Sequence, residues 1–215
     1  MKAKLALALG LALAFAATSA VKAQTVFKAA DIHPDGYPTV EAVIYMGKLL
    51  EERTKGRLSI KEFNNAVLGG EKDTIEQTQF GVIDFNRVSS AQFNNVVPET
   101  KVYGLPFLFR SVEHMRKTVD GPIGEEILAA FEAKGVVALC YYDSGARSFY
   151  TKKPIAKLAD MKGMKIRVQQ SDMWVAMMQA FGANPTPMAF GEVYSAIQTG
   201  VVDGAENNWP SYESS

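Results

Sequence analysis

Apolar side chains recur along the chain with two different spacings, which predicts an alternation of helices and strands. Apolar residues within 39–54 fall at helical spacing, and Gly56 follows as a helix stop. Within 57–63, Leu58 and Ile60 alternate with polar residues, as in a half-buried strand. The same patterns predict further helices over 71–80, 121–134, 171–181 and 191–199, and one that begins at Ser111. They predict further strands over 26–30, 82–85, 136–142, 146–151, 164–168 and 201–203. No closing helix is predicted after the last strand. Short apolar strands between helices are typical of parallel sheets in α/β proteins.

A short phrase occurs twice in similar surroundings. Residues 81–84 read Gly-Val-Ile-Asp and residues 200–203 read Gly-Val-Val-Asp, each after a predicted helix. Coincidence is one explanation, because a glycine between a helix and a strand is common. The matching context favours two similar α/β lobes, which we place at residues 24–144 and, incomplete, at 145–215, with the chain crossing between them near 142–145.

The N-terminus has the three parts of a secretory signal peptide. Residues 1–4 are basic, residues 5–17 are uncharged and apolar, and residues 21–23 offer small side chains at the two positions that define a cleavage site. A transmembrane anchor is the alternative, but the apolar run is short for a bilayer span. We therefore predict a signal peptide over residues 1–23 and export of the protein to the periplasm.

Composition excludes several classes of protein. The chain has 215 residues, 23 Lys and Arg against 23 Asp and Glu, one cysteine and two histidines. The predicted signal peptide holds three of the lysines and no acid, so the remainder lacks the basic excess of a nucleic-acid binder. The single cysteine, Cys140, excludes an internal disulfide framework, and its apolar surroundings predict a place in the core.

No catalytic motif is present in the sequence. It lacks the glycine-rich dinucleotide and phosphate loops, the Gly-x-Ser-x-Gly elbow and the His-Glu-x-x-His metal motif. We therefore predict a binding protein with no catalytic residue, metal or cofactor. The rival from another class is an exported enzyme acting on acidic sugars, for which Glu71, Glu192 and Glu206 are the available acids. A ligand-sensing partner of a membrane receptor is a third option within the binding class.

Two arginines and an asparagine are placed to bind an anion. Met164, Ile166 and Val168 face one side of a predicted strand, which puts Arg167 on the other. Arg147 begins an extended segment, and a guanidinium can grip a carboxylate through two parallel hydrogen bonds. Solvated surface arginines are the alternative. Asn207 follows a predicted strand, where ligands of open α/β sheets bind.

Several longer phrases resemble the periplasmic solute-binding subunits of TRAP transporters (tripartite ATP-independent periplasmic transporters), a family of dicarboxylate-, sialate- and uronate-binding proteins. The phrases are residues 68–71, 81–84, 105–109, 161–168, 182–188 and 192–207. The resemblance covers essentially the whole chain after the signal peptide, and the last block is the most specific. It implies a two-lobed periplasmic binding protein of type II with the ligand cleft between the lobes. It also implies a C-terminal truncation, because family members continue with segments that cross back to complete both lobes.

The resemblance assigns roles to residues of the second lobe. The family's nearly invariant carboxylate-binding arginine falls on Arg167, and a second binding arginine falls on Arg147. The binding asparagine falls on Asn207. A first-lobe contact that is glutamate in sialate binders is Ser89 here, which argues against sialate.

The first lobe lines the other side of the cleft in the family, with His33, Tyr37 and Glu71 at the matching positions. The phrase from His33 to Val40 resembles the branch that binds hexuronates such as glucuronate or galacturonate. A C4-dicarboxylate is the alternative ligand, since two arginines could bind either a hexuronate or a dicarboxylate. The resemblance implies membrane permease subunits as partners, and we expect the protein to be a monomer.

Overall fold

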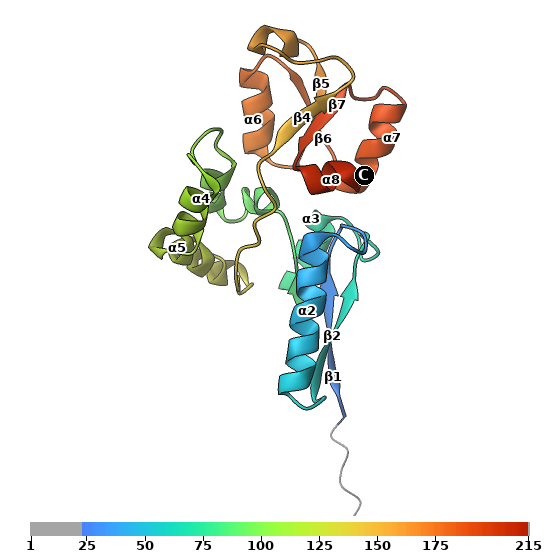
Figure 1. Cartoon of the computed structure of the whole chain (residues 1–215), viewed down its shortest axis with the longest axis vertical. Coiled ribbons are helices and arrows are strands. Elements are labelled where there is room, and N and C mark those ends of the chain that lie inside the picture. The colour runs from blue at the N-terminus through green and yellow to red at the C-terminus, as the bar shows by residue number, and fades with distance from the viewer. Residues whose placement is uncertain (1–22, 215) are drawn as a thin grey trace, which may run out of the picture.

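The computed structural model describes residues 23–214, whose strands form two sheets placed one above the other (Figure 1). The strands are β1 (Thr25–Ala30), β2 (Leu58–Phe63), β3 (Phe85–Asn86), β4 (Ser148–Thr151), β5 (Lys165–Val168), β6 (Asn184–Pro187) and β7 (Gly204–Asn207). The α-helices are α2 (Pro38–Arg53), α3 (Glu71–Gln79), α4 (Val112–Val119), α5 (Pro122–Ala130), α6 (Asp172–Ala180), α7 (Val193–Gln198) and α8 (Trp209–Glu213). Short 3₁₀ helices cover Ser90–Phe93, Pro98–Gly104, Glu132–Lys134, Leu158–Met161 and Phe190–Glu192. The predicted α/β class is confirmed.

The first sheet has the order β2-β1-β3, and both outer strands run parallel to β1. Helix α2 packs against β2. Gly47 permits this close approach, because a Cβ at its position would lie only 3.2 Å from the Cβ of Ile60. We call this sheet with α2 and α3 the first unit.

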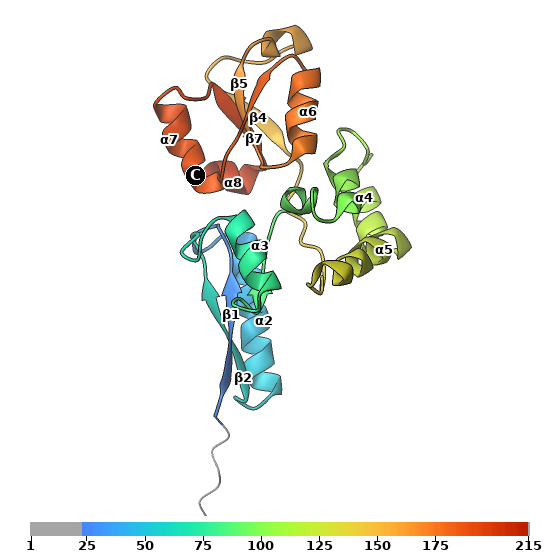
Figure 2. The ribbon, with the colours of Figure 1, turned by 180° about the vertical axis from the view of Figure 1, so that it is seen from behind.

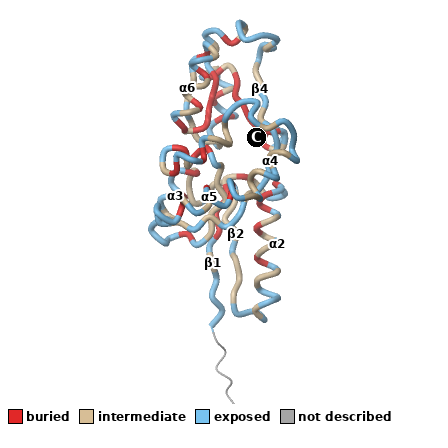
Figure 3. Tube along the Cα trace, turned by 90° about the vertical axis from the view of Figure 1, so that its left-hand side faces the viewer, coloured by how far each residue is buried: buried red, intermediate tan, exposed pale blue. Residues whose placement is uncertain are grey.

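The second sheet has the order β4-β7-β5-β6, with β4 as an antiparallel edge strand on an otherwise parallel sheet. Helix α6 lies on one side of this sheet, and α7 and α8 lie on the other (Figures 1 and 2). We call this sheet with its three helices the second unit. Ile166, Val168, Trp174 and Met178 form most of its core, and buried residues gather in this part of the trace (Figure 3).

Helices α4 and α5 lie beside the two units (Figure 2). Helix α4 contacts α5, and α5 contributes Ile127 to a small apolar cluster with Val97 and Phe131. The segment that leads to these helices reaches the second unit, since Ala91 is part of its core and a Cβ on Gly104 would overlap the Met173 side chain. The lobe boundary at residue 144 stays a prediction.

The repeated sequence phrase builds the same contact in both units. The Asp84 amide donates to the Lys28 carbonyl at 3.0 Å, and its carboxylate accepts from the Lys28 amide at 2.8 Å. Asp203 makes the same pair of hydrogen bonds with Lys165, at 2.7 and 2.8 Å. Each aspartate therefore fixes the strand that follows it against the neighbouring inner strand, β1 in the first sheet and β5 in the second, so the repeated phrase is also a structural repeat.

The predicted strand over residues 136–142 does not form. Val137 and Leu139 are 69% and 63% exposed, and Cys140 is exposed as well. The prediction that Cys140 lies in the core was therefore wrong. No strand pairs with this segment among residues 23–214, so its apolar side chains have no sheet to pack on. Apolar composition shows that a segment prefers burial, but it does not show that a pairing partner exists.

Two other predicted strands begin later than their sequence pattern. The strand predicted over residues 82–85 is reduced to β3, and the one over 201–203 is replaced by β7. The Val82 amide donates to the Gln77 carbonyl at 2.8 Å, and the Val202 amide donates to the Ala196 carbonyl at 3.2 Å. These backbone groups complete the preceding helix ends, so they are not available to a sheet.

The structure also has two elements that the sequence did not predict. Strand β6 contains Pro185 and Pro187, which cannot donate backbone hydrogen bonds but are tolerated because β6 is an edge strand. Helix α8 contradicts the expected lack of a closing helix. The Asn208 side chain caps it by accepting from the Ser211 amide at 3.2 Å, and Pro210 occupies its first turn.

The predicted signal peptide over residues 1–23 lies outside the described residues, except for its last position. Within residues 23–214, no helix combines the length and the apolar character needed to cross a bilayer.

Candidate ligand-binding site

Arg167 is a buried cation whose charge no acidic side chain of residues 23–214 pairs with. It lies near the carboxyl end of β5 and is only 2% exposed. Its Nε and Nη2 donate to the carbonyl oxygen of Met188 at 3.1 and 2.9 Å, and no described carboxylate forms an ion pair with it. Burial lowers the pKa of Arg167, although the negative charge of Glu206 acts to raise it. A buried charge held only by a carbonyl is suited to an anionic ligand.

Arg147 is only partly buried, with 25% of its side chain exposed, and an acid compensates its charge. Its Nε bonds Glu206 Oε2, its Nη2 donates to the Glu206 carbonyl at 3.0 Å, and its guanidinium carbon lies 5.4 Å from the ring centroid of Trp174. Burial would lower the pKa of Arg147, but the charge and hydrogen bond of Glu206 raise it overall. The stacking ring and the carboxylate together fix the orientation of this guanidinium.

Three polar atoms around these arginines are buried and lack a hydrogen-bond partner among the described residues. They are Glu206 Oε1, Trp174 Nε1 and the Tyr150 hydroxyl. Buried polar groups are nearly always satisfied in native proteins, so a cluster of exceptions needs an explanation. Glu206 and Trp174 contact Arg147, and Tyr150 interacts electrostatically with Arg167, so each arginine has an unsatisfied polar side chain near it.

Asn207 ends β7 beside a pocket with aromatic walls. The pocket holds about 160 Å³ and is lined by Ser148, Phe149, Tyr150, Asn207, Asn208, Trp209 and Tyr212. The Asn207 side chain is mostly buried, and its Oδ1 accepts from the Asn208 amide at 2.9 Å. The Asn207 NH₂ group is a further hydrogen-bond donor in this part of the structure.

The first unit contributes a second charged cluster, at the carboxyl ends of β1 and β3. Arg87 grips Asp31 through two guanidinium nitrogens, with Nε 2.6 Å from Oδ2. Burial alone would raise the pKa of Asp31, but hydrogen bonds from Arg87 and His33 bring that pKa to about 2. Glu71 accepts from the Ser89 amide at 2.7 Å and lies 3.9 Å from Arg87 Nη1. The sequence reasoning missed Arg87, although Asp31 and Arg87 each follow strands that pair in this sheet.

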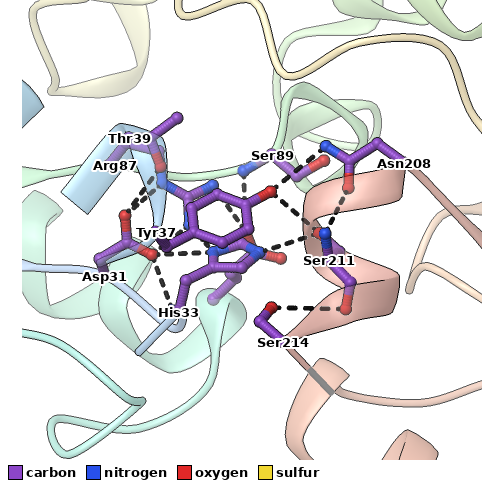
Figure 4. Close-up of polar contacts among 10 residues, drawn as sticks. Asp31, His33, Tyr37, Thr39, Arg87, Ser89, Asn208, Ser211 and Ser214 are labelled. Carbon is purple, nitrogen blue, oxygen red and sulfur yellow. Dashed lines mark hydrogen bonds and ion pairs between the residues drawn. The ribbon is translucent and has the colours of Figure 1, made fainter. Parts of the chain in front are cut away.

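Hydrogen bonds connect the two units across the site (Figure 4). The Ser211 hydroxyl in α8 lies 2.9 Å from the Tyr37 hydroxyl and 3.3 Å from His33 Nε2. The Asn208 side chain donates to the Tyr37 hydroxyl at 3.2 Å. Burial lowers the pKa of His33, with its hydrogen bond to Asp31 opposing, so the neutral imidazole is favoured.

Ser89 makes a further cross-unit contact, because its hydroxyl accepts from the Gln169 side chain at 2.7 Å. From the first unit, His33, Tyr37 and Ser89 contact the second unit directly, and Glu71 holds the Ser89 amide. From the second unit, Arg147 and Arg167 each interact electrostatically with Glu71, and Asn207 precedes Asn208, which contacts Tyr37.

The three acids of the rival enzyme hypothesis do not form a catalytic pair. Glu206 is bound to Arg147, and Glu71 holds the Ser89 amide. Glu192 is exposed, and its carboxylate accepts from the Ala189 amide at 3.0 Å as part of a helix start. Residues 23–214 also contain no cluster of three His, Cys, Asp or Glu side chains that could hold a metal ion.

Comparison with known proteins decides the family. The profile of bacterial extracellular solute-binding protein family 7 (DctP) matches residues 29–215. The chain belongs to this family. Its members and near structural neighbours are transport proteins that bind solutes, not enzymes, and family members are periplasmic. They bind small organic acids and work with a membrane permease.

Solved structures of TRAP periplasmic solute-binding proteins share the fold. One from Bradyrhizobium sp. BTAi1, in complex with α/β-D-galacturonate, is 62% identical with a TM-score of 0.85, and the match covers 87% of this chain and 63% of that one. One from Pseudomonas putida F1, with bound D-glucuronate, is 49% identical with a TM-score of 0.85, covering 88% and 62%. The two-lobed binding-protein fold predicted from the sequence is confirmed by these matches.

A solute-binding protein from Chromohalobacter salexigens is 42% identical over 213 residues. That match covers 99% of this chain and 63% of the relative. The chain thus spans less than two thirds of the length of all three of these relatives.

Proposed function

We propose that this chain is the extracytoplasmic solute-binding subunit of a TRAP transporter, and that it captures a hexuronate such as D-galacturonate or D-glucuronate. One observation carries the proposal: Arg167 is buried at the boundary of the two units with no acidic partner in the described chain. An incoming carboxylate would supply the missing counter-charge through a charge-assisted hydrogen bond. A C4-dicarboxylate is the second candidate, because Arg147 offers a second guanidinium.

The surroundings of Arg167 favour a sugar acid. Tyr150, which interacts electrostatically with Arg167, also lines a pocket that has Phe149 and Trp209 as further aromatic walls and the Asn207 amide for ring hydroxyls. Glu206 Oε1 is a buried acceptor in need of a donor, which a ring hydroxyl provides. The two structures with bound galacturonate and glucuronate, at 62% and 49% identity, support the same ligand class.

Capture would bring the two units together around the acid. Binding energy then shifts an equilibrium between open and closed forms, and the closed form is presented to the membrane permease. The predicted signal peptide places this cycle in the periplasm. We expect a monomer in solution, which light scattering would test.

The direct test of this function removes the Arg167 charge. Arg167→Ala should weaken uronate binding at least about tenfold in isothermal titration calorimetry, because it leaves a desolvated carboxylate unpaired. Arg116→Ala is the matched control, since Arg116 forms a surface ion pair with Asp143 and its side chain is 62% exposed. Equal affinity of the wild type and Arg167→Ala would reject the assignment, as would loss of binding in the control alone.

A further inference from the structure

Tyr150 carries a polar group that the folded chain does not use. It lies in the edge strand β4, and its hydroxyl is buried with no hydrogen-bond partner among residues 23–214. Its ring packs edge-on against Tyr212, with the ring centroids 5.2 Å apart. Phenylalanine would make the same ring contact. Packing therefore explains the ring but not the hydroxyl, whose burial without a partner costs stability.

The register of the second sheet puts the Tyr150 and Arg167 side chains on the same face. Tyr150 in β4 pairs with Ala205 in β7, and Arg167 in β5 pairs with Ala205 from the other side. Side chains at one register position of a sheet share a face. Ala205 is small, so its methyl group leaves open the space between the two longer side chains. Tyr150 is also electrostatically coupled to Arg167, which agrees with this placement.

The hydroxyl is suited to donate rather than to act as a charged group. Burial raises the pKa of Tyr150, so the phenol stays protonated at neutral pH. When Arg167 binds an anion, the neutral Tyr150 hydroxyl can donate a hydrogen bond to that same anion. A carboxylate is the favoured acceptor, because a hydrogen bond to a carboxylate is stronger than one to a neutral acceptor.

We propose that Tyr150 is a ligand-binding residue whose hydroxyl donates a hydrogen bond to the carboxylate that Arg167 holds. The inference rests on the function proposed above, since it needs an acid at Arg167. It predicts an unusual pair of effects. Removing the hydroxyl removes an unsatisfied group from the free protein, so stability is kept or gained, while ligand affinity is lost.

The test compares the wild type with Tyr150→Phe and a matched control, Tyr103→Phe. The control also deletes one phenol oxygen, but that oxygen donates to the Tyr141 hydroxyl at 2.7 Å, beside the apolar cluster of Val97, Ile127 and Phe131. Each protein is titrated with D-galacturonate and D-glucuronate by calorimetry, and each is unfolded thermally without ligand. The two acids differ only in the configuration of one ring carbon, C4, so a contact with the carboxylate should affect both alike.

For Tyr150→Phe we expect affinity for both acids to fall by about 5- to 30-fold, with an unchanged or higher Tm. Tyr103→Phe should lower Tm and keep the affinity. Unchanged affinity of Tyr150→Phe overturns the inference, as does a parallel loss of Tm and affinity, which would mark a structural residue. Weakening of only one epimer also overturns it, because the hydroxyl would then contact the ring. Failure of the wild type to bind either acid instead rejects the proposed function itself.

Discussion

Arg87 and Arg147, which are partly buried, and Arg167, which is buried, differ in what compensates their charge. Arg87 is held by Asp31, and Arg147 by Glu206, in both cases through more than one contact. Arg167 has only the Met188 carbonyl. The first two guanidiniums are thereby fixed in place and their charges satisfied, whereas the third is fixed in place with its charge available. This difference, rather than the number of arginines, points to the position of the ligand carboxylate.

Glu62 provides a residue-scale prediction about pH. Both of its carboxylate oxygens are buried without a described partner, and burial together with the charge of Asp31 raises its pKa from 4.5 to about 7. The folded protein therefore binds a proton that the unfolded chain has released between these two values. The contribution of Glu62 to stability is present below pH 4.5 and is lost as the pH rises through 7.

Glu62→Gln removes this titration, so the stability of the variant relative to the wild type should increase as the pH rises. Thermal unfolding should show a Tm difference that is larger at pH 8 than at pH 4.5 by about 2 °C or more. Glu52→Gln, on the exposed side of α2, is the control and should show no such trend. A Tm difference for Glu62→Gln that is constant with pH would contradict the assignment.

The sequence predicted the identity of the main site residues better than their environment. Alternation in residues 164–168 placed Arg167 opposite Ile166 and Val168, and the family resemblance assigned it a carboxylate. Neither could decide between a solvated and a buried arginine, because burial is set by β6, β7 and Met188, which are distant in sequence. Arg87 and Tyr150 were not predicted as site residues, because their role depends on contacts with other strands that the sequence does not reveal.

At the scale of elements, β4 is held to β7 by an unusually close approach. Gly204 pairs with Thr151, and a Cβ at Gly204 would lie 2.4 Å from both the Tyr150 carbonyl oxygen and Thr151 Cγ2. Real Cβ atoms do not come this close to backbone atoms, so any larger residue must push the edge strand away. The edge strand carries Tyr150, and the sheet contact therefore also positions the site.

Gly204→Ala should lower the free energy of unfolding by roughly 1–3 kcal/mol, because the added methyl group overlaps backbone that cannot give way without breaking the β4–β7 ladder. Urea denaturation measures the change. Gly191→Ala adds the same methyl group where no atom lies within 4 Å, and it should be nearly neutral. Equal stability of the two variants would show that β4 can shift freely.

Elements with strong local signals were predictable, and those that depend on distant partners were not. Helix α2 and strand β2 follow their periodicity within a residue or two, and Ser111 caps α4 as expected, by accepting from the His114 amide at 3.1 Å. Ser171 precedes α6 as expected, but its hydroxyl accepts from Asn94 at 2.8 Å instead of capping the helix. The strand predicted over residues 136–142 does not form, because no described strand pairs with this segment.

At the scale of the whole molecule, hydrogen bonds join the two units, beside a ring contact between His33 and Phe190 with centroids 5.1 Å apart. Ser211 in the second unit contacts His33 and Tyr37 of the first, and Gln169 contacts Ser89. The repeated aspartate phrase predicted two similar units but could not predict these contacts, since their partners lie 80 to 178 residues apart. Hydrogen bonds across such a boundary suit units that must separate and close again around a ligand.

The central claim is that a single placed cation, and not the overall charge of the chain, selects an acid. The most direct test titrates the wild-type protein with D-galacturonate and with D-galactose, which replaces the carboxylate with a neutral hydroxymethyl group. Calorimetry should show that the uronate binds at least about 100-fold more tightly, the difference expected when a buried cation loses its only carboxylate partner. Equal affinity for the two sugars would contradict the account.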